Sequence, residues 1–491
     1  MKLKNYIGGQ WQDPENGQYI QDIDPGNGEL IAEVPASSTR DAERAIEAAR
    51  QAYDSWRKVP APKRGEILYT VGQILKERKH ELAQKMTREM GKVYTEAAGD
   101  VQEGIDMAFY MAGEGRRSFG YTTPSELPDK FAMATRDSVG VAGIITPWNF
   151  PMAIPTWKIF PALVCGNTVV FKPASETPWL AHELVSILDQ AGVPAGVVNL
   201  VFGSGSVVGE TLISDPRVNL ISFTGSNETG RHVAKVAGEG LKRVSLELGG
   251  KNAIIVLDDA DLDLAVDGIL WSAFGTTGQR CTACSRLIVQ KGIYQRLEQR
   301  LAERIGQLRL GHGLDAQTDV GPLINAGAVD KVHHYVTIGQ QEGARLVVGG
   351  HPANDGAYAK GHYYAPTLFA DVAPTMRIAT EEIFGPVLSM IAVDDLDEAV
   401  GVNNRVTYGL SSSIFTQDVN RAFRAIRDLA TGIVYINAGT IGAEIHLPFG
   451  GTRGTGNGHR EAGTAALDFF SEWKAVYVDY SGRLQRAQID A

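Results

Sequence analysis

The segment Gly278-Gln279-Arg280-Cys281-Thr282 places a cysteine among small and polar residues, where its thiol could act as a nucleophile. The thiolate is the reactive form, and a free cysteine with a pKa of about 8.5 is scarcely ionised at neutral pH. Cys281 could open a helix, and either the first N–H groups of that helix or the neighbouring Arg280 would raise the thiolate fraction. The alternative is a small buried hydrophobic residue, which suits Cys165 in an apolar run better.

Glu247 lies between two leucines, directly before the break at Gly249-Gly250. A carboxylate removed from water has a raised pKa and can act as a general base near neutral pH. The alternatives are a solvated charge at the end of a strand and a member of an internal ion pair.

Asn149 stands between Trp148 and Phe150 in the proline-bracketed segment TPWNFP, directly after an apolar run. The prolines restrict the backbone, so the amide is a rigid donor that could stabilise a developing oxyanion. The alternative is a proline-fixed loop whose asparagine satisfies its own backbone.

Two glycine-containing turns, 203–209 and 225–230, each follow an apolar run. Such turns let a backbone approach a pyrophosphate at the N-terminus of a helix. Neither has the spacing G-x-G-x-x-G, so each alone is weak support for a dinucleotide site.

Short apolar runs separated by helical patterns must position these side chains, and they predict an α/β protein built on parallel sheets. The last expected strand could pair with another subunit or form an edge of its own domain. Helices are expected over 40–56 (capped by Thr39), 63–90 and 179–190. Strands are expected over 139–145, 168–171, 197–201, 220–223, 253–257, 285–289, 345–348, 432–436 and 475–480.

The composition is that of a soluble globular protein. The 491 residues are 44% hydrophobic and 21% charged, enough for a large core and several domains. The net charge of −10 disfavours nucleic acid as a partner, and no apolar run approaches the roughly 18 residues of a membrane span. Three cysteines and no visible secretory signal predict a cytoplasmic protein, with neither a disulfide framework nor a metal site.

Seven short motifs in this order resemble the aldehyde dehydrogenase superfamily: TPWNFP, FKPASETP, FTGSNETG, LELGGKN, GQRC, EEIFGP and PFGG. The resemblance covers essentially the whole chain. It implies a Rossmann-like cofactor-binding domain over 1–116 and 139–249, and a catalytic α/β domain over 250–465. It also implies a small β oligomerisation element over 117–138 and 466–491, and therefore a homodimer or homotetramer.

The resemblance further implies oxidation of a small-molecule aldehyde to a carboxylic acid with NAD(P)+. Cys281 would attack the carbonyl to form a thiohemiacetal, whose oxyanion Asn149 and the Cys281 N–H would hold. Hydride transfer would leave a thioester, which water activated by Glu247 would hydrolyse. One rival function is a coenzyme A-acylating enzyme, against which Glu247 argues. The other is an inactive binding or structural homologue, against which all three residues argue.

For the cofactor, the resemblance assigns the adenosine-side and nicotinamide-side riboses to Lys172 and Glu382. Ser175 stands where NAD-selective relatives often carry a glutamate that repels a 2′-phosphate, so we expect NADP to be accepted and leave a preference for it open. The expected cofactor-binding residues are Thr146, Trp148, Lys172, Ser175, Gly205, Gly225, Ser226, Glu382 and Phe384.

For the substrate, the resemblance assigns the tunnel aromatics to Phe150, Trp157 and Phe449, with core packing as the alternative for Trp157. Arg280 adjoins the nucleophile and could pair with the carboxylate of a semialdehyde. The alternative is that Arg280 packs against protein and shapes its loop. After PFGG the chain carries Thr452-Arg453-Gly454-Thr455 where the family usually has Lys and Ser, and the aldehyde itself stays undetermined.

Overall fold

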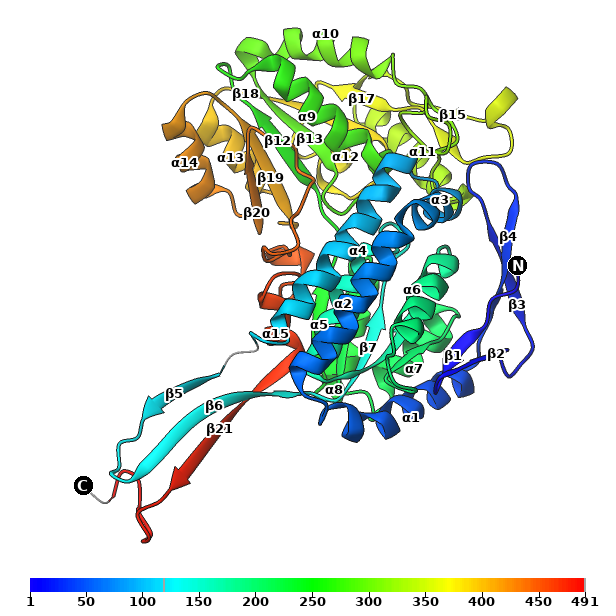
Figure 1. The fold of residues 1–491 in the computed structure, drawn as a ribbon. Helices are drawn as coiled ribbons and strands as arrows, with labels where there is room; N and C mark the ends of the chain where they lie inside the picture. The colour runs from blue at the N-terminus through cyan, green and yellow to red at the C-terminus, as the bar shows by residue number, and fades with distance from the viewer. Residues whose placement is uncertain (118–119, 490–491) are drawn as a thin grey trace.

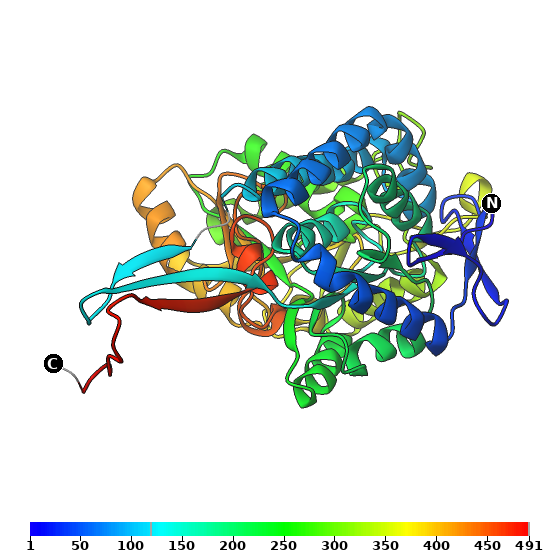
Figure 2. The same cartoon turned by 60° about the horizontal axis from the view of Figure 1, so that its bottom comes forward.

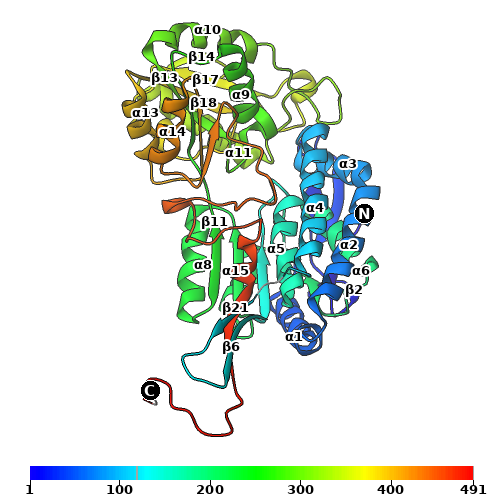
Figure 3. The same cartoon turned by 60° about the vertical axis from the view of Figure 1, so that its left-hand side comes forward.

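The computed structural model describes residues 1–117 and 120–489. Two seven-stranded sheets occupy opposite ends of the body, and a three-stranded sheet projects from it as an arm (Figure 1, Figure 3). Residues 118, 119, 490 and 491, which belong to the expected oligomerisation element, lie outside the described residues. Among the described helices, none combines the length and apolar character needed to cross a membrane.

The first sheet is parallel through its central strands, which are buried on both faces because helices cover each side. Only β1 and β2 at its edge run antiparallel to their neighbours. The strand order is β11 (Arg243–Glu247), β10 (Leu220–Thr224), β7 (Val141–Ile145), β8 (Thr168–Lys172), β9 (Val198–Leu200), β1 (Asn5–Ile7) and β2 (Gln10–Gln12).

Two helical layers enclose this sheet. One face carries α1 (Thr39–Trp56), α7 (Glu210–Ser214) and α8 (Asn227–Glu239). The other carries α5 (Ala153–Cys165) and α6 (Pro178–Gln190), backed by α2 (Ala61–Glu77), α3 (Lys79–Met90) and α4 (Tyr94–Glu114).

The second sheet is also mostly parallel, and only β14 runs antiparallel to its neighbour. Its order is β14 (Arg345–Val348), β17 (Thr367–Ala370), β18 (Val387–Val393), β13 (Cys284–Gln290), β12 (Asn252–Val256), β19 (Ser411–Phe415) and β20 (Ile433–Ile436). One face is covered by α9 (Leu262–Phe274) and α10 (Tyr294–Ile305). The opposite face is covered by α11 (Ala326–Gln341), α12 (Arg377–Thr380), α13 (Leu396–Asn404) and α14 (Val419–Asp428).

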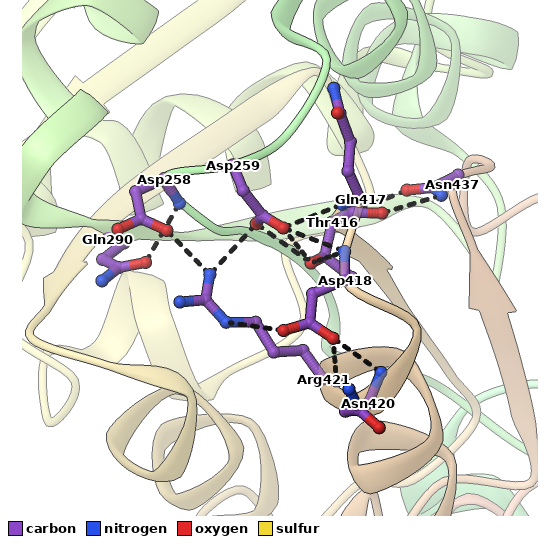
Figure 4. Close-up of polar contacts among 9 residues, drawn as sticks. All are labelled: Asp258, Asp259, Gln290, Thr416, Gln417, Asp418, Asn420, Arg421 and Asn437. Carbon is purple, nitrogen blue, oxygen red and sulfur yellow. Dashed lines mark hydrogen bonds and ion pairs between the residues drawn. The ribbon is translucent and has the colours of Figure 1, made fainter.

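Polar contacts join the carboxyl ends of β12 and β19 to the start of α14 (Figure 4). Asp259 accepts hydrogen bonds from the backbone of Gln417 and Asp418, each at 3.0 Å. Arg421 of α14 pairs with Asp258 at 2.7 Å and with Asp259 at 3.1 Å. Ligands usually bind at the carboxyl ends of parallel strands. At these two strands of the second sheet, the contacts among Asp258, Asp259 and Arg421 occupy that position instead.

The arm consists of β5 (Tyr121–Pro124), β6 (Lys130–Ser138) and β21 (Ser471–Asp479), which Figure 2 shows extending from the body. Strand β21 pairs antiparallel with β6 from Ser471 opposite Ser138 to Asp479 opposite Lys130. The last strand therefore pairs within its own chain and lies at an edge of its sheet. The remaining elements are β3 (Tyr19–Ile23), β4 (Leu30–Pro35), β15 (Pro352–Ala353), β16 (Tyr363–Tyr364) and α15 (Ala465–Phe470).

Two helix predictions are wrong in detail. Ser38, not Thr39, caps α1: its side chain accepts from the Asp41 N–H while the Asp41 carboxylate accepts from the Ser38 N–H, a reciprocal capping box. The helical stretch expected over 63–90 is two helices, because the backbone leaves helical geometry at Arg78 (φ −97°, ψ 7°).

Candidate active site

Two cavities meet at Cys281, between the carboxyl edge of the first sheet and the loop that leads into β13. We call the first cavity the tunnel and the second, of about 220 Å³, the cleft. The wall that they share consists of Ile154, Thr224, Leu248 and Cys281. The tunnel is further lined by Glu103, Phe150, Trp157, Glu247, Arg280, Phe449 and Glu461, and the cleft by Trp148, Asn149, Gly225, Ser226, Gly249, Lys331, Glu382 and Phe384.

The hypothesis that a helix begins at Cys281 is wrong. After α9 the chain makes a 3-10 turn, Gly275–Gly278, with Thr276 and Thr277 at positive φ (51° and 57°), and then enters β13. Burial, followed by the Glu247 and Glu382 carboxylates, raises the pKa of Cys281 to about 12. Without a helix N-terminus, a base is needed to remove the thiol proton.

Cys284, the other cysteine of this segment, is the first residue of β13 and is buried. Its Sγ lies 3.3 Å from the backbone oxygen of Arg286. Only Cys281 of the two lines the tunnel and the cleft.

Asn149 does not satisfy its own backbone. Its Nδ2 donates to the Gln279 carbonyl at 3.0 Å, which fixes the amide beside Cys281 and leaves its second N–H for a ligand. The buried Lys92 Nζ donates to the Asn149 carbonyl at 2.7 Å and to Asp100 at 3.0 Å. Asp100 in turn accepts from the Ala153 N–H at 2.7 Å, so the loop is held on both sides of the asparagine.

Glu247 ends β11 with only 3% of its surface exposed, so it is not a solvated charge. Neither of its carboxylate oxygens has a partner in the described part of the chain, so it is not an ion-pair member. Burial, followed by the neighbouring Glu461, raises the pKa of Glu247 well above its usual range, whereas Lys158 and Arg460 oppose this rise. A buried carboxyl with a raised pKa matches the requirement for a general base near neutral pH.

The sequence analysis missed the pair beside Glu247. Lys158 Nζ bonds to Glu461 and donates to Ser222 Oγ at 2.9 Å, and the lysine side chain is fully buried. A signal was available, because Lys158 is the only charged residue in the otherwise apolar run 153–165. Glu103 of α4, which also lines the tunnel, carried no such signal.

The expected tunnel aromatics line the tunnel together. The Trp157 and Phe449 rings meet edge to face with centroids 5.0 Å apart. Trp157 also packs in the hydrophobic core, so both interpretations describe it. Phe150 lies beneath Lys92 Nζ, 3.8 Å from the ring centroid.

Arg280 lines the tunnel while part of its guanidinium is already bound. Its Nε donates to Thr276 Oγ1 at 2.9 Å, and one terminal nitrogen donates to the buried Glu96 at 3.3 Å. The guanidinium carbon lies 5.2 Å from the ring centroids of both Phe150 and Trp271. Arg280 therefore shapes its loop and also presents itself to the tunnel.

Glycines keep the cleft beside Cys281 open, as the close approach of a dinucleotide requires. A Cβ at Gly249 would lie 2.3 Å from Glu382, and a Cβ at Gly225 would lie 2.6 Å from Phe223, so only glycine leaves this space open. Glu382 accepts from the Gly250 N–H at 2.9 Å, while the Trp148 and Phe384 rings meet at 87°. Ser226 caps α8 by accepting from the Thr229 N–H at 3.3 Å.

A third cavity, of about 510 Å³, lies on the other side of β10 and is lined by Gly205, Ser206, Gly209, Glu210 and His232. A Cβ at Gly209 would lie 3.7 Å from the aliphatic stem of Lys172, so the lysine borders this region. Burial lowers the pKa of Lys172 to about 8, and its Nζ donates to the Pro173 carbonyl. Thr146 donates its N–H to the Lys172 carbonyl at 3.2 Å, and Ser175 is half-buried. Glycine walls and a lysine at one end fit the phosphates and ribose of a dinucleotide.

A family model described as "Aldehyde dehydrogenase family" matches residues 11–476. The chain is 43% identical to the alpha-ketoglutaric semialdehyde dehydrogenase of Bacillus subtilis (strain 168), over 96% of this chain and 97% of that protein. It is 39% identical to the NADP+-dependent succinate-semialdehyde dehydrogenase of Escherichia coli (strain K12), over 96% and 97%. The crystal structure of betaine aldehyde dehydrogenase from Staphylococcus aureus in complex with NAD+ superposes with a TM-score of 0.96 at 35% identity, covering 98% of this chain and 96% of that one.

Proposed function

The chain belongs to the aldehyde dehydrogenase family and oxidises an aldehyde to a carboxylic acid with NAD(P)+, and from this we propose that its substrate is a semialdehyde bearing a carboxylate. The observation that carries this proposal is Arg280, a guanidinium in the wall of the tunnel that leads to Cys281. The names of the Bacillus and Escherichia relatives, both acidic semialdehyde dehydrogenases, support it. Neither relative supports a coenzyme A-acylating or non-catalytic protein.

We propose that Cys281 is the nucleophile. Its Sγ loses a proton to Glu247, which lines the same tunnel, and forms a C–S bond with the aldehyde carbon. The carbonyl oxygen becomes an oxyanion held by the free Asn149 N–H and the Cys281 N–H. The nicotinamide, when bound, accepts the hydride.

The same site then hydrolyses the thioester that remains on Cys281. After Glu247 has passed the thiol proton to solvent, it takes a proton from a water molecule, the resulting hydroxide adds to the thioester carbon, and the C–S bond breaks to release the acid and the thiolate. Since Glu247 is buried and has no partner in the described chain, its carboxylate is available for this proton.

The substrate proposal is tested by comparing kcat/KM for 2-oxoglutaric semialdehyde, succinic semialdehyde and propanal, with and without coenzyme A. We expect the acidic semialdehydes to be preferred and coenzyme A to change nothing. Arg280→Ala should raise KM for the acidic substrates by roughly tenfold more than KM for propanal, because a charge-assisted contact is lost. Equal effects on all three aldehydes would remove Arg280 from substrate recognition.

For the cofactor, we propose that NADP+ is accepted through Lys172 and Ser175. Ser175 can donate to a 2′-phosphate, and Lys172 supplies positive charge beside it. Glu176 adjoins this lysine and raises its pKa against burial, which favours the charged ammonium. The Escherichia relative is named for NADP+ and the Staphylococcus structure holds NAD+, so both cofactors occur among similar proteins.

The substitution Ser175→Glu tests this cofactor proposal. The new carboxylate should raise KM for NADP+ by roughly tenfold or more and affect KM for NAD+ little. Ser175→Ala is the matched control, because it removes the hydroxyl without adding charge. Native protein that turns over with NAD+ and shows no rate with NADP+ would contradict the proposal.

We further propose that the cofactor-binding, catalytic and oligomerisation parts divide the chain at the boundaries given above, and that the arm joins copies into a homodimer or homotetramer. Several large apolar residues are exposed on the arm, among them Phe131, Tyr477 and Val478, as an interface requires. Light scattering of the native protein measures the oligomeric state, and a monomer would contradict this assignment.

Three unpaired cysteines also favour a cytoplasmic location.

A further inference from the structure

Glu103 is a charged residue of the tunnel wall that the chemistry described so far leaves unused. Its side chain has no hydrogen bond or ion pair within the part of the chain that the structure describes. The other charged residues of this wall differ: Arg280 is bound to Glu96, Glu461 is bound to Lys158, and Glu247 is the general base proposed above. An unpaired carboxyl in a partly buried wall faces whatever enters the tunnel.

The charged and titratable groups around Glu103 come from several elements. Its own helix, α4, contributes Asp100 and Asp106, the segment between α3 and α4 contributes Lys92, and the loop before β13 contributes Arg280. Strand β20 contributes Tyr435, whose buried hydroxyl has no partner among the described residues. The tunnel wall further holds Cys281, Glu247 and Glu461.

These neighbours determine the protonation of Glu103. Burial, followed by Asp100, raises the pKa of Glu103 to about 8, although Arg280 and Lys92 oppose this rise. Arg280 and Glu96 together carry no net charge. When Glu103 ionises, the wall beside Arg280 therefore gains one negative charge, which a substrate carboxylate meets and an uncharged aldehyde does not.

We propose that Glu103 is a specificity-determining residue of the tunnel: as a carboxylic acid it donates a hydrogen bond to the far carboxylate of the semialdehyde beside Arg280, and as a carboxylate it repels that end of the substrate. This inference rests on the proposed function, because it requires an acidic substrate. It predicts that recognition of acidic aldehydes weakens with rising pH while recognition of uncharged aldehydes does not.

The test is the ratio of KM for 2-oxoglutaric semialdehyde to KM for propanal, measured from pH 6.5 to pH 9.5 at saturating cofactor. The roles of Cys281, Glu247 and the cofactor site in the chemistry are common to both substrates and cancel in the ratio, and the variant below separates Glu103 from the other charges of the wall. For the native protein we expect the ratio to rise about tenfold between pH 7 and pH 9, as a group with a pKa of about 8 ionises.

Glu103→Gln keeps the size of the side chain and its donor but cannot ionise, so the ratio should stay constant within about twofold. The matched control is Asp106→Asn on the same helix, whose exposed carboxylate accepts from Gln102 at 2.8 Å. The ratio should rise as much as in the native protein, with its midpoint slightly lower because Asp106 is the last of the groups that raise the pKa of Glu103.

A rise that persists in Glu103→Gln would assign the titration to another group, such as Lys92, and overturn the proposal. A flat ratio in the native protein would overturn it without any variant, even if Glu103→Gln does not fold. In both cases the proposed function stands if the acidic semialdehyde is still preferred at pH 7. A preference for propanal at pH 7 would instead overturn the proposed function, and this inference with it.

Discussion

Two fully buried lysines stand behind the two halves of the site, and their surroundings differ. Lys92 faces one carboxylate, Asp100, and their remaining polar atoms bond to the backbone of Asn149 and Ala153. Lys158 is bound to one carboxylate, Glu461, and a second carboxyl, Glu247, lies nearby without a partner. Lys92, which has one carboxylate beside it, fixes the position of a loop. Lys158 lies near two carboxyl groups and binds one of them, so the other keeps a raised pKa.

The difference between the two lysine sites matters for function only if Cys281 is the nucleophile on which both sites act. Cys281→Ala should lower the rate of aldehyde oxidation by more than about 10⁴-fold, because the covalent route is lost, while cofactor binding persists. Steady-state NAD(P)H absorbance and a cofactor-binding titration measure the two effects. Cys284→Ala is the control, because its Sγ is buried and lines neither cavity, and it should retain most activity. If Cys284→Ala were the dead variant, the nucleophile would be misassigned.

The second prediction isolates the unpaired carboxyl. Glu247→Gln should slow thioester hydrolysis by about 10²- to 10⁴-fold, because the general base is lost. Because Glu247 also takes the thiol proton in the proposed mechanism, the burst of NAD(P)H should slow as well. Stopped-flow absorbance separates the two phases. A burst at the native rate would mean that another group deprotonates Cys281 and would confine Glu247 to hydrolysis.

The third prediction compares the two lysine sites directly. Glu461→Gln removes the charge that, after burial, most raises the pKa of Glu247, so that pKa should fall. Since the carboxylate is the active form, the midpoint of thioester hydrolysis should move to lower pH by roughly one unit. Single-turnover hydrolysis measured from pH 5 to pH 9 tests this shift.

The matched variant at the other lysine is Asp100→Asn. It breaks the contacts that hold the Asn149 loop, so it should slow the burst phase and leave the midpoint of hydrolysis unchanged. Equal shifts in the two variants would erase the distinction between a lysine that fixes geometry and a lysine that controls protonation.

The sequence predicts most of the fold because the parallel strands are buried on both faces. Strands β7, β8, β10 and β12 are short, mostly apolar runs between helical patterns, and the structure places each within about two residues of its expected position. The error at the start of α1 was avoidable, since Asp41 three residues after Ser38 forms the capping-box spacing.

The protonation of the site is not readable from the sequence. Lys158 and Glu461 are separated by 303 positions, and Glu382, which helps to raise the pKa of Cys281, lies about a hundred residues beyond it. Motif residues gave the identity of the candidates, but burial and neighbours decide their charge. The hypothesis of a helix at Cys281 failed for the same reason: a local glycine pattern does not reveal that the chain turns and enters β13.

A third group of buried carboxyls, which has no buried lysine bound to it, gives the smallest expected effect. Burial raises the pKa of Asp22 on β3 to about 7, and burial with repulsion from Asp22 raises that of Glu89, at the end of α3, well above its usual range. The native protein thus binds more protons here than the unfolded chain, whose aspartates titrate near about 3.9. The contribution that these protonated carboxyls make to the free energy of unfolding is fully present below about pH 4, and it is lost as the pH rises toward 7.

Asp22→Asn removes this titration, so its melting temperature should decline less between pH 5 and pH 8 than that of the native protein, by a few degrees at most. Thermal unfolding at fixed ionic strength measures the difference. Asp106→Asn is the control, because its carboxylate is exposed and the variant should follow the native pH dependence. The contacts of Lys92 with Asp100 and of Lys158 with Glu461 would then mark what the pair Asp22 and Glu89 lacks, which is a buried lysine bound to a carboxyl group. Parallel curves for Asp22→Asn and the native protein would show that these carboxyls are ionised in the fold and would break that contrast.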